Sequence, residues 1–232
     1  MGYNISTMYI WRNFNGECSC PTCKIRQKTE SDFIDLYLSE AVMEDAEREK
    51  VNKYGFCEKH FDVLYAGNNK LGLTLQTETR ITRLKKLIKP VKDGKSAKKH
   101  AENLKNEICD CIICRRLEDN MKRYYETTAR LYSDDEKFRN VNFKEVNGFC
   151  YPCYVRLLEN SSKAGKYAKQ FSDEISQITL NSLEKLSENL KDFKMAFDYR
   201  SKKTPSKEAS FSLKEASLKL YGEKPLSPEK KR

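Results

Sequence analysis

Two short stretches of the sequence carry three cysteines in the same C-x-C-x-x-C frame. The first is CSCPTC at residues 18–23, and the second is CDCIIC at residues 109–114. Each is followed by a Gly-Phe-Cys motif, in GFCEKH at 55–60 and in GFCYPC at 148–153. Cysteine thiolates and neutral imidazoles are common zinc ligands, and a two-residue spacing lets both side chains of a pair reach one ion. The sequence therefore predicts two metal sites.

We expect each copy of this pattern to close its own site with four ligands. The first predicted set is Cys20, Cys23, Cys57 and His60. The second predicted set is Cys111, Cys114, Cys150 and Cys153. A histidine in one set where the other has a cysteine fits zinc, which accepts three cysteines with one histidine as readily as four cysteines, whereas a disulfide framework gives no reason for it. The expected cofactor is Zn²⁺ at two structural sites, with an iron–sulfur cluster or metal-free thiols as alternatives.

Cys18 and Cys109, the first cysteines of the two frames, are surplus to these sets of four. Each is either a bystander inherited by duplication, a ligand that alternates with its neighbour, or part of a redox switch. In the switch, oxidation pairs Cys18 with Cys20, or Cys109 with Cys111, and ejects zinc. Thiolates near a helix start are suited to this chemistry.

The repeated motifs indicate a tandem duplication of one helical unit. In the second copy, Leu117, Met121, Tyr124 and Leu131 recur at helical spacing, and the first copy has a similar stripe around Phe33. The predicted fold is all-α, with two tandem repeats, each closed by a zinc site at the starts of helices, and a helical C-terminal extension. The expected segments are an N-terminal segment 1–17, a first repeat 18–88, a basic linker 89–104, a second repeat 105–200, and an amphipathic segment with a disordered tail 201–232. In the N-terminal segment, Tyr9, Trp11 and Phe14 are expected to pack on the first repeat.

The chain is basic, with a formal net charge of +10, and most of that charge lies between residues 80 and 99. Asp93 is the only acidic residue in this stretch. Such a segment can bind the phosphates of nucleic acid, although it lacks interleaved aromatic residues for base stacking. The candidate phosphate contacts are Arg83, Lys85, Lys86, Lys98 and Lys99.

Several functional classes are not expected from the sequence. It has no apolar run long enough to span a membrane and no secretory signal at its start, so we expect a cytoplasmic protein. It also lacks a phosphate-binding glycine loop and a nucleophile elbow, so an enzyme is not expected, and thiol redox chemistry is the only enzymatic class with residues to serve it. The expected function is a non-catalytic scaffold or interaction module with an unknown protein partner. The alternatives are a thiol redox sensor that releases zinc on oxidation, and a nucleic-acid-associated protein.

The motif pairs CPTC with GFCEKH and CIIC with GFCYPC resemble a bacterial and archaeal family of unknown function. The FDYR at 197–200 resembles a further segment of that family, and the resemblance covers roughly residues 18–221. It implies metal sites and a duplication, and it implies no activity. The sequence departs from the family at Cys153, where the family usually has histidine.

Overall fold

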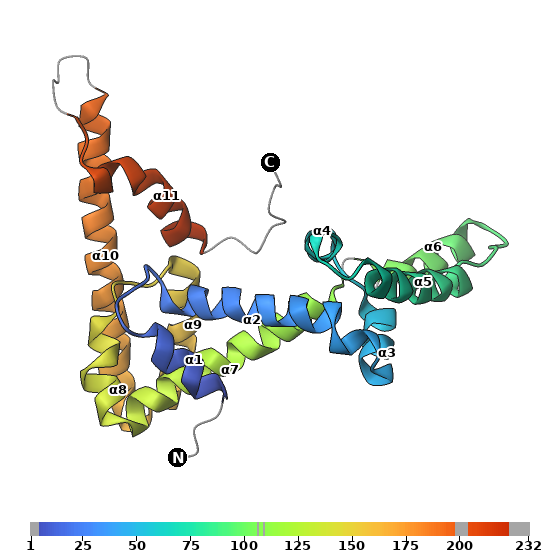
Figure 1. Cartoon of the computed structure of the whole chain (residues 1–232), viewed down its shortest axis with the longest axis horizontal. Helices are drawn as coiled ribbons and strands as arrows, with labels where there is room; N and C mark the ends of the chain where they lie inside the picture. Colours follow the sequence, from blue (N-terminus) through green and yellow to red (C-terminus); the bar gives the residue numbers. More distant parts are fainter. Residues whose placement is uncertain (1–4, 106, 109, 198–203, 223–232) are drawn as a thin grey trace. The chain divides into compact units, whose positions relative to one another are not determined.

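A computed structural model describes residues 5–105, 107–108, 110–197 and 204–222 of the chain. Throughout these residues the regular structure consists of α-helices and short 3-10 helices, with no strand (Figure 1). The predicted all-α fold is confirmed. None of the described helices is both long enough and apolar enough to cross a membrane.

The first half of the chain contains six α-helices within the described residues. They are α1 (Ile5–Asn13), α2 (Pro21–Leu38), α3 (Asp45–Tyr54), α4 (Glu58–Ala66), α5 (Lys70–Leu87) and α6 (Gly94–Lys105). The second half contains α7 (Ile112–Asp134), α8 (Glu136–Asn140), α9 (Tyr151–Glu159), α10 (Ala168–Ala196) and α11 (Lys207–Tyr221). The 3-10 helices are η1 (Glu40–Val42), η2 (Asn142–Glu145) and η3 (Ser161–Tyr167).

The described residues form two compact units. The terminal unit contains residues 5–27 and 121–222, and the central unit contains residues 28–120. The borders between the units therefore fall inside α2 and inside α7. These packing units differ in their bounds from the repeats at 18–88 and 105–200, which were inferred from sequence similarity, so the tandem duplication remains a prediction.

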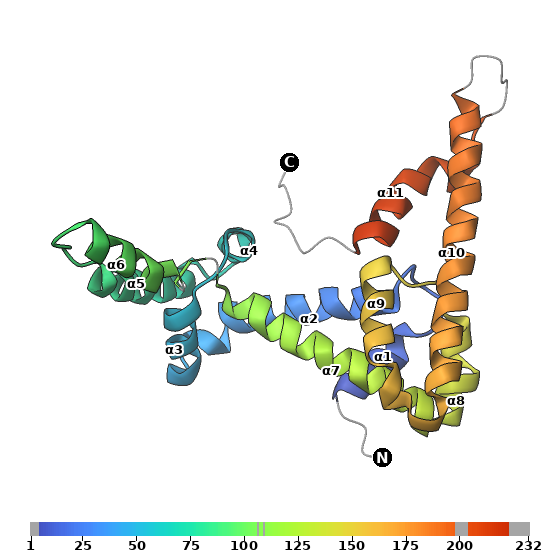
Figure 2. The ribbon, with the colours of Figure 1, turned by 180° about the vertical axis from the view of Figure 1, so that it is seen from behind.

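The terminal unit is built on α10, with α9 and α11 packed against it (Figures 1 and 2). Its core is aromatic: Phe14 stacks on Phe143 with ring centroids 5.8 Å apart, and Trp11 meets the edge of Phe138 at 5.3 Å. Tyr9 also lies near Tyr124, with ring centroids 6.3 Å apart. The expectation that Tyr9, Trp11 and Phe14 cover the first repeat is therefore wrong, because the aromatic partners of all three belong to the predicted second repeat.

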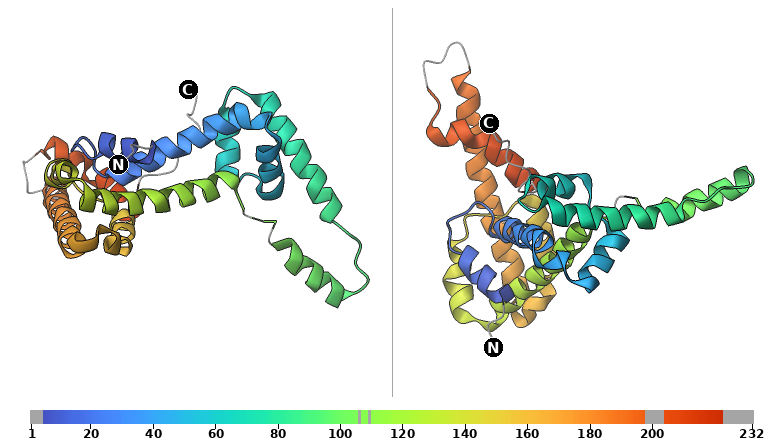
Figure 3. Two further views of the ribbon diagram at one scale, coloured as in Figure 1. Left: turned by 90° about the horizontal axis from the view of Figure 1, so that it is seen from below. Right: turned by 45° about the vertical axis from the view of Figure 1, so that its right-hand side comes forward.

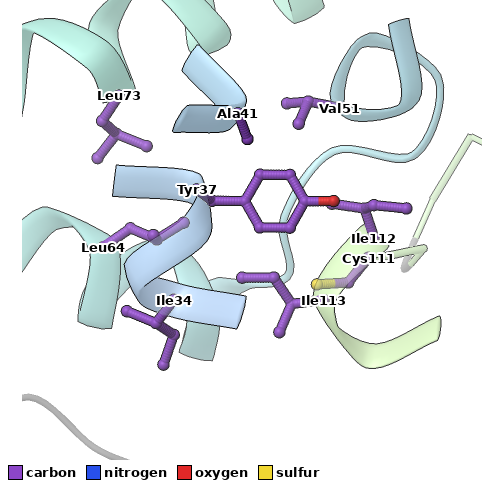
Figure 4. Packing of buried hydrophobic residues seen from close by; sticks show 9 residues of the cluster. All are labelled: Ile34, Tyr37, Ala41, Val51, Leu64, Leu73, Cys111, Ile112 and Ile113. Carbon is purple, nitrogen blue, oxygen red and sulfur yellow. The ribbon is translucent and has the colours of Figure 1, made fainter. Parts of the chain in front are cut away.

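The central unit packs around Tyr37, whose side chain is fully buried (Figure 4). Its hydroxyl donates to Glu47 at 3.1 Å, and Glu47 also accepts from Arg116 at 2.6 Å and from Lys50 at 2.8 Å. Burial would raise the pKa of Glu47, but the hydrogen bonds from Lys50 and Arg116 lower it below its usual value. The core of this unit thus contains a buried carboxylate held by two cations.

The remaining helices of the central unit, α5 and α6, run in opposite directions and are joined by residues 88–93 (Figure 3). Arg80 on α5 donates to Glu107 at 2.8 Å and to the carbonyl oxygen of Asn52 at 2.9 Å. Arg83 donates to the same carboxylate at 3.0 Å. These bonds attach α5 to the segment that leads into α7.

Candidate metal centres

All four predicted ligand pairs lie at the start of a helix, as the sequence predicted. Cys57 and Cys150 are the N-cap residues of α4 and α9, and both have extended backbone dihedral angles. Cys20 and Cys111 directly precede the first residues of α2 and α7. In each pair the second ligand follows three residues later, within the first helical turn. Free backbone N–H groups and the positive end of the helix dipole favour thiolates at these positions.

The terminal unit brings together four buried cysteines, which we call the tetracysteine cluster: Cys20, Cys23, Cys150 and Cys153. The Sγ atom of Cys23 lies 3.4 Å from that of Cys150 and 3.7 Å from that of Cys153. The four sulfur atoms, including that of Cys20, all lie within 4.8 Å of one another. Each of these cysteines is at most 5% exposed.

The central unit brings together a Cys3His cluster, made by three cysteines and one histidine, that is more open to solvent. The Nδ1 atom of His60 lies 3.2 Å from the Sγ of Cys57 and 3.4 Å from those of Cys111 and Cys114. The four ligand atoms again lie within 4.8 Å of one another. His60 and Cys111 are buried, Cys57 is half-buried, and Cys114 is exposed.

The predicted pairing within each copy is wrong, because the structure exchanges the partners. Cys20 and Cys23 lie beside Cys150 and Cys153. Cys57 and His60 lie beside Cys111 and Cys114. The physical reason is the length of the helix that follows each C-x-x-C. At 1.5 Å per residue, the 18 residues of α2 carry the chain about 27 Å along its axis, away from Cys20 and Cys23. All eight predicted residues are still used, in one tetracysteine and one Cys3His group.

The donor sets and their spacing fit a tetrahedral metal ion. With zinc–sulfur bonds of about 2.3 Å, the sulfurs of a tetrahedral site lie about 3.8 Å apart. The sulfur–sulfur distances of 3.4, 3.7 and 3.8 Å are close to that value. A disulfide requires about 2.05 Å, and the cysteines of both clusters are unbridged.

The electrostatics of the tetracysteine cluster show why four adjacent thiols favour a cation. Burial would raise the pKa of Cys20, but hydrogen bonds with Cys150 and Cys153 lower it well below its usual value. Hydrogen bonds of Cys23, first with Cys150 and then with Cys153 and Cys20, raise its pKa far above its usual value. One thiolate forms easily and then opposes ionisation of its neighbours. A divalent ion at the centre removes this conflict, because it attracts all four.

The Cys3His cluster has the same pattern and adds a histidine held by a carboxylate. Hydrogen bonding with Cys114 lowers the pKa of Cys111 to about 3 and raises that of Cys114. Burial would lower the pKa of His60, but Cys111 and Glu30 raise it to about 10. Positive charge is therefore favoured at this position, and a metal ion would supply it.

Glu30 is a candidate functional residue that the sequence reasoning missed. Its carboxylate lies 3.0 Å from the Nε2 atom of His60 and is almost completely buried. Metal-ligating histidines usually donate their second ring nitrogen to such a group, which fixes the tautomer and the ring orientation. One signal was available, because Glu30 lies three and four residues before Phe33 and Ile34, in register with the apolar stripe of α2.

The tetracysteine cluster also has neighbours that were not predicted. The hydroxyl of Thr22 lies 3.3 Å from the Sγ of Cys20, and that of Tyr125 lies 3.6 Å from the Sγ of Cys153. Burial, followed by the charge of Cys153, raises the pKa of Tyr125, so its hydroxyl stays protonated and can donate to sulfur. These hydroxyl groups are suited to stabilising thiolates in a buried site.

Of the two surplus cysteines, Cys18 is described by the structure and does not belong to either cluster. Cys18 is half-buried, and its Sγ lies 3.8 Å from the carbonyl oxygen of Asn13. Cys109 lies outside the described residues. The redox switch that involves these residues therefore stays a prediction.

The basic segment divides into engaged and exposed cations. Arg83, a predicted phosphate contact, is paired with Glu107. The other four predicted contacts are exposed on α5 and α6, namely Lys85, Lys86, Lys98 and Lys99.

The fold and the sites define an all-α protein with two cysteine-rich clusters that could each hold a metal ion. A family model described as "Family of unknown function (DUF6062)" matches residues 1–227, and the chain belongs to this family. No curated protein and no solved structure matches the chain.

Proposed function

We propose that the protein is a non-catalytic helical scaffold or interaction module stabilised by two structural zinc ions. The observation that carries the proposal is the convergence of eight ligands from four helix starts into one tetracysteine and one Cys3His group. Thiolates and imidazole are soft to borderline ligands, and a closed tetrahedral set of them is typical of structural zinc. A reducing compartment such as the cytoplasm would keep these thiols available for metal.

Zinc would join segments that are distant along the chain. In the terminal unit, one ion would tie the start of α2 to the start of α9. Structural zinc contributes about 10–16 kcal/mol in small peptide systems, while whole domains are stable by about 5–15 kcal/mol. The free energy that each ion would contribute is therefore large enough to decide whether its unit folds.

A structural role fits these donor sets better than a catalytic one. A catalytic zinc keeps one coordination position open for water or substrate, whereas each cluster here offers four protein ligands. We therefore propose that a protein partner would bind the surface of the helices, while the clusters stabilise the fold.

Metal analysis of anaerobically purified full-length protein tests the proposal. We expect two zinc ions per chain, and two freely reactive cysteines until a chelator exposes the rest. Cys23→Ser should retain one ion, and the control Cys18→Ser should retain both. Protein without metal, or with the visible absorption of an iron–sulfur cluster, would contradict the proposal.

A second candidate function is the binding of an anionic polymer, and the exposure of Lys85, Lys86, Lys98 and Lys99 favours it. Each phosphate contact adds about 0.7–0.9 to the slope of log affinity against log salt. A gel shift with nucleic acid at low salt, lost when these four lysines are changed to glutamate, would support this candidate. A chain that fails to shift at low salt, or a variant that shifts equally well, would refute it.

A further inference from the structure

Lys219 is a lysine buried beside the tetracysteine cluster. It lies near the end of α11, is 1% exposed, and donates from Nζ to the carbonyl oxygen of Ser19 at 2.8 Å. Ser19 directly precedes the ligand Cys20. A buried ammonium group is costly unless hydrogen bonds and an opposite charge compensate it. A carbonyl supplies only the hydrogen bond, so the opposite charge must come from other groups nearby.

The end of α11 lies directly on the sulfur atoms. Gly222 ends the helix with a positive φ of 80°, which favours glycine. A Cβ atom at this position would lie 3.6 Å from the Sγ of Cys150 and 3.7 Å from the Sγ of Cys23. The helix end thus covers the cluster at van der Waals distance.

Gly148 provides the space for the lysine on the other side. Its φ is 154°, and a side chain there would collide with the Nζ of Lys219 and the hydroxyl of Ser182. Gly148 lies two residues before the ligand Cys150. The lysine therefore passes across the backbone that leads into the cluster, and its ammonium group approaches ligand segments from both halves of the site.

The charge of an occupied site accounts for this lysine. Four thiolates and one divalent ion carry a net charge of −2, in a cluster whose members are at most 5% exposed. Burial lowers the pKa of Lys219, and the negative charges of Cys20, of Glu215 on the same helix and of Cys150 oppose this shift. Lys219 contacts the segment before Cys20 and the segment before Cys150, and the metal would hold these two segments together, so loss of the ion would disrupt the place where the lysine is bound.

We propose that α11 is a metal-dependent cover of the tetracysteine site, with Lys219 as the counter-cation of the metal tetrathiolate. The inference rests on the proposed function, because it requires metal at this cluster. The helix docks when the four thiolates hold an ion and loosens when the ion leaves. The central unit offers a contrast: there Arg80 lies against Gly55 and is paired with Glu107, so its charge is compensated without a metal.

Lysine labelling of the full-length wild-type protein tests this cover without any substitution. The protein is loaded with two equivalents of zinc, treated with an amine-reactive ester with or without chelator, and analysed by mass spectrometry. We expect Lys219 to react about tenfold more slowly in the loaded protein than after chelation, because opening would separate a buried charge from its partner. The exposed Lys214 on the same helix is the control and should react equally in both states.

Equal labelling of Lys219 with and without zinc, in protein that holds two ions, would overturn the cover and leave the proposed function intact. Protein that binds no metal would overturn both. A matched pair of variants adds a second readout. Lys219→Met removes the charge and keeps an unbranched side chain that is one atom shorter, and it should release zinc from the tetracysteine site about tenfold faster than Lys214→Met does. Equal release rates in these two variants would also contradict the inference.

Discussion

The most informative perturbation of the Cys3His site is Glu30→Gln, which removes the charge behind His60 and keeps the shape of the side chain. The Nε2–Oε1 distance is 3.0 Å, and the side chains of His60 and Glu30 are only 5% and 2% exposed. Loss of such a partner lowers metal affinity about 10- to 100-fold, or about 1.4–2.7 kcal/mol. Because both groups are screened from water, we expect an effect in the upper half of this range.

The assay is a competitive titration of the full-length protein with a chromophoric chelator, repeated with cobalt in place of zinc. The two sites can be told apart because three and four thiolates give charge-transfer bands of different intensity. Asp35→Asn, an exposed substitution on the same helix, is the control. We expect Glu30→Gln to weaken only the Cys3His site and Asp35→Asn to weaken neither. Unchanged affinity in Glu30→Gln, or equal weakening of both sites, would refute the role given to Glu30.

Three further predictions concern the release of metal, the stability of the central unit and the surplus cysteines. A chelator should remove metal in two phases, first from the Cys3His site and then from the tetracysteine site. The Cys3His site is the more accessible, because Cys114 is exposed and a cavity of about 540 Å³ opens beside Cys57. A single phase for both ions would contradict this order. Glu47→Gln should lower the free energy of unfolding at pH 7 by about 1–3 kcal/mol, measured with denaturant. Since the folded-state pKa of Glu47 is lowered, this stabilisation is present above the unfolded value of about 4.3 and is lost as pH falls through the folded value, so the two proteins should converge in acid. If the redox switch operates, peroxide should release zinc more slowly from a Cys18→Ser, Cys109→Ser double variant than from wild type, and equal release rates would end that hypothesis.

The identity of the candidate ligands could be predicted from the sequence, because their chemistry is local. The C-x-x-C spacing and the position of each pair at a helix start depend on neighbouring residues only. Histidine at position 60, opposite Cys153 in the predicted repeat, also favoured a metal site over a disulfide framework. The all-α fold could be predicted as well, from apolar residues at helical spacing.

The pairing of the ligands could not be predicted, because it depends on where long helices lead. Cys20 and Cys23 are nearer in sequence to Cys57 than to Cys150, and sequence distance favoured the wrong partner. The same limit applies to Trp11, whose partner Phe138 is far along the chain. Lys219 was missed for a related reason, since nothing in its own segment distinguishes it from the exposed lysines around it.

Anomalous diffraction at the zinc edge, from crystals of the full-length protein, tests the central claim most directly. We predict two zinc peaks, each with zinc–sulfur distances of about 2.3 Å. One peak should lie among Cys20, Cys23, Cys150 and Cys153, and the other among Cys57, His60, Cys111 and Cys114. A zinc ion shared by Cys20, Cys23, Cys57 and His60, or clusters with no zinc peak, would contradict the account.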